Sequence, residues 1–461
     1  MSGGTARTGA NTALQAVLKE AGCSHAALAR RVVELAHRQG VVMRYDKASV
    51  TRWLQGMQPR GRAPEFIAAA LSDMLKRTVT PTDIGMTTAV QRPVVARALA
   101  YCEDVGESLH TLAELGSTAV SRRSLLGSVP FVASALVEPQ REWLLWLLEE
   151  EQAPTLAVVA GGGQVEQVHA MIEMFDQMDN TYGGVGVHTS IVNYLTIEVV
   201  PMLQKRGTAH HQRKQLFTAA AKLAAMAGWS SYDSADYGIA QRHMIQALRL
   251  CREGGDRVLG GQILAGLSHL CTSLGHPQEG VALARAGLAT AKSAGSPLGL
   301  MRLHAMAARG HASLGDSRAA TTALHAATNA LDQSRGASQE SVWVRFLDAH
   351  YLEAEAALCH RDLGEAASAE RLAEASVDAN AERRRRQAIS RSVLATARLQ
   401  QGRLDEALGT ATRALDGLEG VHSERSVQAL RDFRLRLVPH RQEPSVREFE
   451  RRAKPVLGVS A

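Results

Sequence analysis

The second half of the chain repeats small residues at fixed offsets, and this pattern restricts the fold more than any other feature of the sequence. One column of five residues has spacings of 40, 40, 49 and 38: Ala235, Gly275, Gly315, Gly364 and Gly402. The positions five residues later are Ala240, Gly280, Ala320, Ala369 and Ala407, and those twelve later are Ala247, Gly287, Ala327, Ser376 and Ala414. Seven residues earlier stand Gly228, Ser268, Ala308, Ala357 and Ala395. Paired helices in a repeat need small residues where they approach closely and a turn residue between them, so the pattern predicts a helical solenoid.

The offsets match the frame of small residues in tetratricopeptide repeats (TPR), lengthened here by longer turns such as residues 295–297. We therefore expect an all-α protein with a TPR-like solenoid over residues 138–440 and clear repeats over about 218–420. Aromatic residues make up only 4% of the composition, which suits close packing of helices better than a β-sheet core. Residues 441–461 are assigned to a C-terminal tail.

The net charge of +6 is concentrated in the first 85 residues. This segment holds twelve Lys and Arg against six Asp and Glu, so 12 − 6 accounts for the whole excess, and the remaining chain has 40 charges of each sign. Because phosphate neutralisation is local, a basic first domain on a neutral body is typical of a DNA-binding protein with a sensor domain. An uneven but solvated surface charge is the alternative.

Four short helices are predicted within residues 11–85, and we interpret them as a helix-turn-helix domain. Asn11 and Ser24 are expected N-caps of the first two helices, which end at Gly22 and Gly40. Apolar residues recur at helical spacing between these signals, so each helix has one inward face.

The segments on either side of this domain have weaker signals. Residues 1–10 are small and polar, and we expect a disordered leader. Residues 86–137 contain helical stretches broken by proline and glycine, and are assigned to a partly helical linker. The helix that begins near Glu138 carries Trp143 and Trp146, and we interpret it as the buried first helix of the second domain; an exposed face for oligomerisation is the alternative.

The third predicted helix, residues 47–54, is the candidate for DNA recognition. Asp46 is its expected N-cap, and Val50, Trp53 and Leu54 form one apolar stripe. The other positions carry the short polar or basic side chains that a helix in the major groove needs to reach base edges. The candidate contacts are Lys47, Ser49 and Arg52 for bases, Thr51 for bases or phosphates, and Arg44, Arg60 and Arg62 for phosphates. An ordinary amphipathic helix with a solvated basic face is the alternative.

Residues 49–56, with the sequence S-V-T-R-W-L-Q-G, resemble the recognition-helix ending S-x-I-S-x-W-E-x-G of phage-repressor-type helix-turn-helix proteins. Leu54 stands where that class has Glu, and the connection from residues 28–30 is longer than its tight turn. The resemblance implies a helix-turn-helix fold that binds double-stranded DNA.

Two further segments carry polar groups that a ligand or partner could use. Asp179 and Tyr182 belong to a polar and aromatic turn between two long predicted helices, and we treat them as candidates for a ligand or partner surface, with a capped turn as the alternative. The arginine run at residues 383–386 is interpreted as a solvated helix face, with a contact to DNA or to an acidic partner as the alternative.

Nothing in the sequence indicates catalysis, a cofactor or a metal. The five cysteines are scattered without a C-x-x-C pair, and the 17 histidines form no H-E-x-x-H motif. We therefore expect neither enzyme activity nor a cofactor or metal site. The chain has no N-terminal signal and no run of 18 apolar residues, so we expect a cytoplasmic protein without membrane contact.

Taken together, these segments resemble the streptomycete NsdA-type regulators and the wider set of actinobacterial helix-turn-helix/TPR transcriptional regulators. The resemblance rests on residues 44–54, on the run Ser121-Arg122-Arg123 and on residues 227–242. It implies negative regulation of sporulation and antibiotic production. Within the last stretch, Trp229, Tyr232 and Asp233 are added to the candidates for ligand or partner contact.

The leading hypothesis is a DNA-binding repressor whose solenoid forms a homodimer and senses a small molecule, a peptide or a protein. The alternative is an interaction adaptor that sequesters a regulatory protein without contacting DNA. A peptide receptor with an asparagine-lined inner face is a weaker alternative, because the repeat region holds few asparagines, Asn329 and Asn380 among them.

Overall fold

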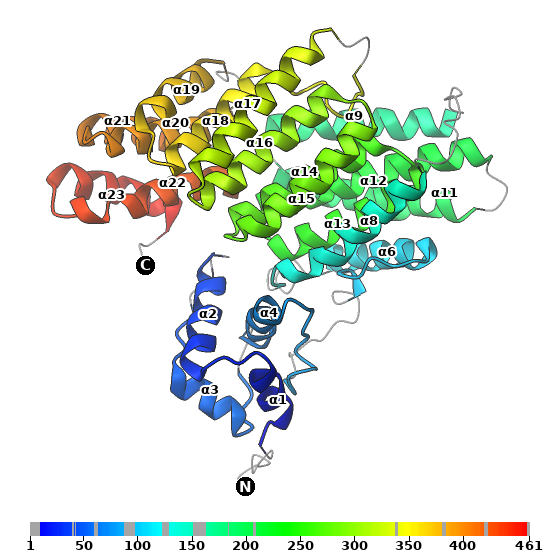
Figure 1. Cartoon of the computed structure of the whole chain (residues 1–461), viewed down its shortest axis with the longest axis horizontal. Helices are drawn as coiled ribbons and strands as arrows, with labels where there is room; N and C mark the ends of the chain where they lie inside the picture. The colour runs from blue at the N-terminus through cyan, green and yellow to red at the C-terminus, as the bar shows by residue number, and fades with distance from the viewer. Residues whose placement is uncertain are drawn as a thin grey trace.

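The computed structural model describes residues 10–38, 41, 43–59, 63–86, 97–121, 129–150, 163–182, 184–205, 209–336, 340–379, 384–418 and 423–458. Within these ranges every regular element is a helix, which confirms the predicted all-α class. A group of short helices from the N-terminal part lies below a larger array of paired helices (Figure 1).

The N-terminal domain contains α1 (Thr12–Glu20), α2 (His25–Arg38), α3 (Lys47–Leu54) and α4 (Ala63–Leu75). The predicted caps are present, because Asn11 accepts a hydrogen bond from the Leu14 N–H and Asp46 accepts one from the Ser49 N–H, both at 2.9 Å. The apolar faces of the helices share one core, whose buried side chains include Leu14, Leu28, Val32, Val50, Trp53, Phe66 and Leu71. The helical patterning of the sequence therefore located this core correctly.

The helices of the second half form consecutive pairs that pack side by side, as expected of a helical repeat. The pairs are α12 (His210–Asp233) with α13 (Tyr237–Gly254), α14 (Arg257–Ser273) with α15 (Pro277–Ser293), α16 (Pro297–Ser313) with α17 (Ser317–Ser334), α18 (Ala349–Asp362) with α19 (Ala366–Ala379), and α20 (Arg384–Gln400) with α21 (Leu404–Asp416). The first helices of these pairs form what we call the inner face.

The first column of small residues lies at the turn within each pair. All five members have a positive φ, from +60° at Ala235 to +81° at Gly275. The N–H of the following residue donates to the carbonyl five residues earlier at 2.9 to 3.0 Å in every turn, as in a Schellman motif. The column therefore marks the place where the first helix ends and the chain reverses.

The other three columns lie where helices of the array meet. All fifteen residues of these columns are buried. A Cβ on Gly287 would lie 2.2 Å from Leu303 Cδ2, and one on Gly228 would lie 2.7 Å from Met244 Cγ. Small residues are needed here because larger side chains would push neighbouring helices apart.

A layer of helices precedes the pairs: α8 (Val137–Glu150), α9 (Gly163–Tyr182), α10 (Gly184–Asn193), a π-helical segment (Tyr194–Val199) and α11 (Val200–Gln204). Trp143 is fully buried, and its Nε1 donates to Thr290 Oγ1 at 3.0 Å. Trp146 is also buried, whereas Leu148 is 62% exposed. The two tryptophans therefore anchor α8 to the array, as expected for a buried first helix.

The described part of the segment assigned to a linker packs against both regions. In α6 (Val105–Ser121), Leu109 and Leu112 belong to the core of the array, and the helix contacts α13. The 3₁₀ helix Ala133–Leu136 contacts α4, and Val132 just before it exchanges two hydrogen bonds with the Gln241 side chain, at 2.9 and 2.6 Å. This segment therefore ties the N-terminal domain to the first helix pair.

The C-terminal part folds back onto the array. It contains α22 (Glu424–Arg436), a 3₁₀ helix (Val438–His440) and α23 (Pro444–Leu457). α23 lies within the segment assigned to a tail, and it forms because Val446, Phe449 and Leu457 bury one face. α22 contacts α20 and α12, so it spans from the last pair to the first along the inner face (Figure 1).

The N-terminal domain also touches the turn between α14 and α15. Arg38, the last residue of α2, donates from Nη1 to the Gly275 carbonyl at 3.0 Å. Lys76 Nζ lies 3.1 Å from Glu279 Oε1. α3 lies on the side of the domain away from the array (Figure 1).

Candidate functional site

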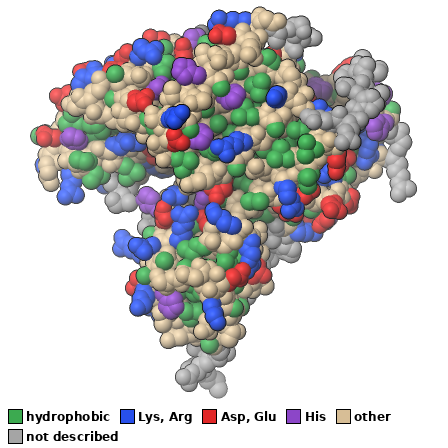
Figure 2. Space-filling model, in the orientation of Figure 1, with side chains coloured by type: hydrophobic (Ala, Val, Ile, Leu, Met, Phe, Trp, Pro, Cys, Tyr) green, Lys and Arg blue, Asp and Glu red, His purple; other side chains and the backbone are tan. Residues whose placement is uncertain are grey.

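The outer face of the N-terminal domain carries the basic side chains predicted to contact DNA. Arg44, Lys47 and Arg52 are exposed on and just before α3. Figure 2 shows several Lys and Arg side chains along this domain. Arg60 and Arg62 lie outside the described residues, so their predicted phosphate contacts stay predictions.

Two of the predicted contact residues on α3 have hydroxyl groups engaged within the protein. Ser49 is only 5% exposed, and its hydroxyl donates to Asp46 Oδ1 at 2.8 Å. The same hydroxyl accepts from the Asp46 N–H at 3.4 Å, which completes a capping box. This position differs from the outward one that the sequence predicts for Ser49. Thr51 is half-buried, donates to the Lys47 carbonyl at 3.1 Å and lies 3.3 Å from His25 Nδ1.

The basic residues of this domain differ in whether an acid neutralises them. Arg31 pairs with Glu34 and Asp73, Arg38 with Glu34, Lys76 with Glu279, and Arg77 with Glu20. In the part of the chain that the structure describes, Arg44 and Lys47 have no ion pair within 4.0 Å, and Arg52 donates to the Ser49 hydroxyl at 3.2 Å. Arg44 and Lys47 therefore leave positive charge without a paired acid at the start of α3, on the face turned away from the array. Lys19 on α1 and Arg30 on α2 are also exposed and have no ion pair among the described residues.

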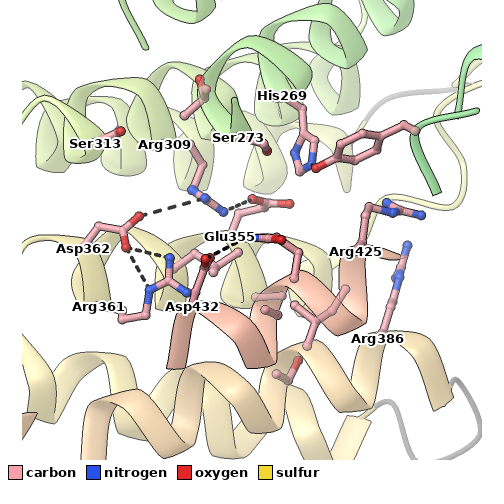
Figure 3. Close-up of a pocket in the computed structure, with 18 of the residues that line it drawn as sticks. His269, Ser273, Arg309, Ser313, Glu355, Arg361, Asp362, Arg386, Arg425 and Asp432 are labelled. Atoms are coloured by element: carbon pink, nitrogen blue, oxygen red, sulfur yellow. Dashed lines mark hydrogen bonds and ion pairs between the residues drawn. The ribbon is translucent and has the colours of Figure 1, made fainter. Parts of the chain in front are cut away.

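A second candidate site is a cavity of about 340 Å³ on the inner face. Its walls come from α12, α14, α16, α18 and α20, and α22 covers it. Figure 3 shows Arg361 and Asp362 on one side, with Arg386 and Arg425 on the other. Arg38 of the N-terminal domain also lines the cavity.

One side of the cavity holds a network of ion pairs. Arg309 lies 3.3 Å from Glu355 and 4.0 Å from Asp362, and Arg361 lies 2.6 Å from Asp362 (Figure 3). Asp432 of α22 accepts a hydrogen bond from Gln428 at 3.1 Å, and burial raises the pKa of its carboxyl. The network therefore combines charged pairs with a carboxyl group that burial keeps easier to protonate.

Behind the other side lies the buried carboxylate of Asp233, at the end of α12. Arg425 donates to it from Nε and Nη2, and Arg385 donates from Nη1 at 2.8 Å. Burial opposes the ionisation of Asp233, but the charge and hydrogen bonds of Arg425 outweigh this effect and lower the pKa of the carboxyl. Asp233 therefore joins the first pair to α20 and α22.

The structure brings together four of the five residues proposed from the sequence for ligand or partner contact. Arg385 also lies 3.3 Å from Asp179, and Arg425 lies over the rings of Trp229 and Tyr232 at 5.3 and 5.6 Å. Tyr232 lines the cavity, whereas Asp179, Trp229 and Asp233 lie outside its lining. Asp179 and Tyr182 lie in the last turn of α9, and not in a turn after the helix as the sequence predicts, because α9 continues to Tyr182. The side chain of Tyr182 lies outside the described residues.

Sequence reasoning missed the arginines and acids of the cavity. Arg385 and Arg386 belong to the run interpreted as a solvated helix face, but both are half-buried. Arg309, Glu355 and Asp362 are spaced like ordinary surface charges of amphipathic helices. The sequence could have indicated these residues through their positions on the first helix of each pair, because those helices line the inner face of a solenoid.

Among the residues that the structure describes, no three His, Cys, Asp or Glu side chains come together as a metal site requires. None of the described helices is both long and apolar enough to cross a bilayer.

Comparison with known proteins identifies part of the chain. Residues 14–87 match the family model of the SP15 N-terminal domain. This range begins within α1 and contains α2 to α4, and the long region of paired helices follows it. No curated protein matches the chain.

Proposed function

We propose that the protein is a DNA-binding transcriptional regulator in which α2 and α3 act as a helix-turn-helix unit. The observation that carries the proposal is the exposed, unneutralised basic face around α3, formed by Arg44, Lys47 and Arg52. A helix of this kind can enter the major groove, where its basic side chains reach base edges and phosphates. Arg44, Lys47 and Arg52 are the residues that we propose to contact DNA, while Ser49 stabilises the start of the helix.

The paired helices are proposed to act as a TPR-like solenoid for dimerisation and for binding a signal or partner. Arg38 supports communication between the two parts, because it belongs to α2, donates to the Gly275 carbonyl and lines the cavity. A change at the inner face would therefore reach the helix that packs against α3. Negative control of sporulation and antibiotic production is the role that the resemblance to NsdA-type regulators suggests.

The adaptor hypothesis places a protein partner on the inner face of the solenoid. In this protein α22 occupies part of that face and contacts both α12 and α20. The position of α22 favours a regulator with a small internal site over an adaptor with a wide groove. The salt dependence of binding distinguishes the regulator from the adaptor, because DNA binding weakens steeply with salt as phosphate contacts are lost.

The test is DNA binding by a double variant, Lys47→Ala with Arg52→Ala. Genomic fragments of the source organism are screened by DNase footprinting at about 0.15 M salt, and the affinity of the protected site is then measured for each protein. We expect the double variant to bind at least about tenfold more weakly, since each lost base or phosphate contact costs about 1 kcal/mol or more.

The matched control is Lys76→Ala with Arg77→Ala, which removes the same charge from the same domain. Both residues are exposed and already paired with Glu279 and Glu20. We expect this control to change the affinity less than about twofold. Absence of a protected site on every fragment, or equal affinity of both double variants and the unmodified protein, would exclude the proposal.

A further inference from the structure

We propose that the cavity on the inner face binds a small organic anion that carries a carboxylate or a phosphate group. The inference rests on the proposed role of the solenoid as the signal-binding part, and it names the chemical class of the signal. Three observations support it: the size of the cavity, the arginine donors of its lining and a buried arginine N–H without a partner.

The size and cover of the cavity favour a small molecule over a peptide or a protein helix. α22 lies across the inner face, and the space that remains is about 340 Å³. Pockets for small ligands begin at about 300 Å³, so this space suits a compact metabolite. A helix or an extended peptide would need the room that α22 already occupies.

The charged donors of the lining suit an anion. Five arginines line the cavity with three acids, Glu355, Asp362 and Asp432, and two acids outside the lining, Glu34 and Asp233, pair with Arg38 and Arg425. Arginine donors match the oxygens of carboxylates and phosphates, and hydrogen bonds between charged groups are stronger than those between neutral ones.

On the Arg309 side of the cavity, one polar atom of the lining residues is buried and has no hydrogen-bond partner among the described residues: Arg309 Nε. A buried donor without an acceptor costs free energy, so such atoms are usually satisfied by a ligand or a water molecule. An anionic oxygen near Arg309 would satisfy the Nε–H, which Glu355 and Asp362 leave unused. The rings of Tyr232, Tyr237 and Tyr351 supply flat surfaces for the body of an organic ligand.

The site also has a direct connection to the N-terminal domain. Arg38 and the turn residues Ser273 and Leu274 line the cavity. Arg38 also donates a hydrogen bond to the carbonyl of Gly275, the next residue of that turn. An anion that attracts Arg38 would compete with this contact between α2 and the array. Binding would therefore alter how the DNA-contacting domain is held.

The experiment titrates the full chain with two probes by calorimetry, at constant ionic strength maintained with sodium chloride. Inorganic phosphate represents phosphate groups, and 4-hydroxybenzoate represents an aromatic carboxylate. We expect saturable binding of at least one probe, and the probe that binds decides between the two kinds of anion. In Arg309→Gln we expect binding at least about tenfold weaker, because one charge-assisted hydrogen bond is lost.

The matched control is Arg398→Gln. Arg398 pairs with Glu370 and Glu374, has nearly the same side-chain exposure as Arg309, 15% against 12%, and does not line the cavity. We expect Arg398→Gln to bind the probe with unchanged affinity. Equal loss in both variants would mean that general destabilisation, and not the cavity, explains the effect, and would overturn the proposal.

A second variant, Ala354→Phe, covers the case in which Arg309→Gln fails to fold. Ala354 lines the cavity, so a phenyl group there would fill part of it and is expected to abolish binding. No saturable binding of either probe, or full affinity in Ala354→Phe, would overturn the proposal. The titration uses no DNA, so its failure leaves the DNA-binding proposal intact. Failure of DNA binding likewise leaves the result of the titration unchanged, and the two proposals can therefore fail separately.

Discussion

At the scale of single residues, two buried histidines make the array sensitive to acid. His243 is 1% exposed, and neither ring nitrogen has a hydrogen-bond partner among the described residues. Burial lowers the pKa of His243 to about 3, and the neighbouring His188 adds to this effect. Burial also lowers the pKa of His269 well below its usual value. Both rings are therefore neutral in the folded protein at neutral pH.

We predict that His243 contributes to loss of stability between about pH 6.5 and pH 3. A group whose folded pKa is depressed takes up its proton more readily in the unfolded chain, so the free energy of unfolding is highest above the unfolded pKa of about 6.5 and falls as the pH drops. Each pH unit in this window costs up to about 1.4 kcal/mol for this group. His243→Leu should therefore lose less stability than the unmodified protein between pH 7.5 and pH 5.

Urea unfolding at the two pH values measures this difference. His210, an exposed residue at the start of α12, is the control. His210→Leu should retain the full pH dependence of the unmodified protein. If His243→Leu and His210→Leu lose the same stability on acidification, protonation of His243 is not responsible.

At the scale of elements, the turns within the helix pairs decide where each first helix ends. Four of the five turn residues are glycines, which adopt a positive φ without steric cost. The fifth, Ala235, has a φ of +60° between α12 and α13. An alanine in the left-handed region is destabilising by about 1 to 2 kcal/mol.

We predict that Ala235→Gly raises the free energy of unfolding by about 0.5 to 1 kcal/mol. The substitution removes the left-handed strain, and the greater freedom of glycine in the unfolded chain offsets part of the gain. Chemical denaturation of the full chain provides the measurement. Ala294→Gly is the control, because Ala294 ends α15 with a φ of −81° and should lose stability. If Ala235→Gly lowers the free energy of unfolding as much as Ala294→Gly does, the prediction is wrong.

At the scale of the whole molecule, Asp233 joins parts of the chain that are far apart in sequence. Its carboxylate binds Arg385 at the start of α20 and Arg425 at the start of α22, and the Ser423 hydroxyl lies 3.5 Å away. One buried ionic cluster therefore links the first helix pair of the array to its last helices. The cluster also holds α22, which lies beside the cavity.

We predict that Asp233→Asn destabilises the protein by about 3 to 5 kcal/mol and loosens α22. The change leaves two arginines beside a neutral amide in a buried site. Removal of one partner of a buried ion pair is strongly destabilising because the remaining charge has no compensating group. Hydrogen exchange should increase over residues 424–457 before it increases over α14 and α15. Protection of α22 equal to that in the unmodified protein would contradict this role.

Asp416→Asn is the control for Asp233→Asn. Asp416 pairs with Arg452, but its side chain is 56% exposed. Exposed ion pairs contribute about 1 kcal/mol or less, so this variant should leave the exchange of α22 unchanged.

Much of the helical framework could be predicted from local patterns. The five turn residues and the buried columns of small residues follow from offsets that repeat along the chain, and Asn11 and Asp46 cap their helices as predicted. The candidate sites were less accessible to this reasoning. Ser49 occupies an outward position in the pattern of α3, yet its hydroxyl turns back to the cap.

The sequence by itself determined the all-α class, the paired helices and the location of the positive charge, because each depends on residues close together in the chain. Only the tertiary structure decided which charges meet. Asp233 and Arg425 are 192 residues apart, and Arg309 and Glu355 are 46 apart on different pairs. Helical periodicity shows which side chains share a face, but the packing of one helix on another decides which faces meet, and that packing places α22 over the cavity.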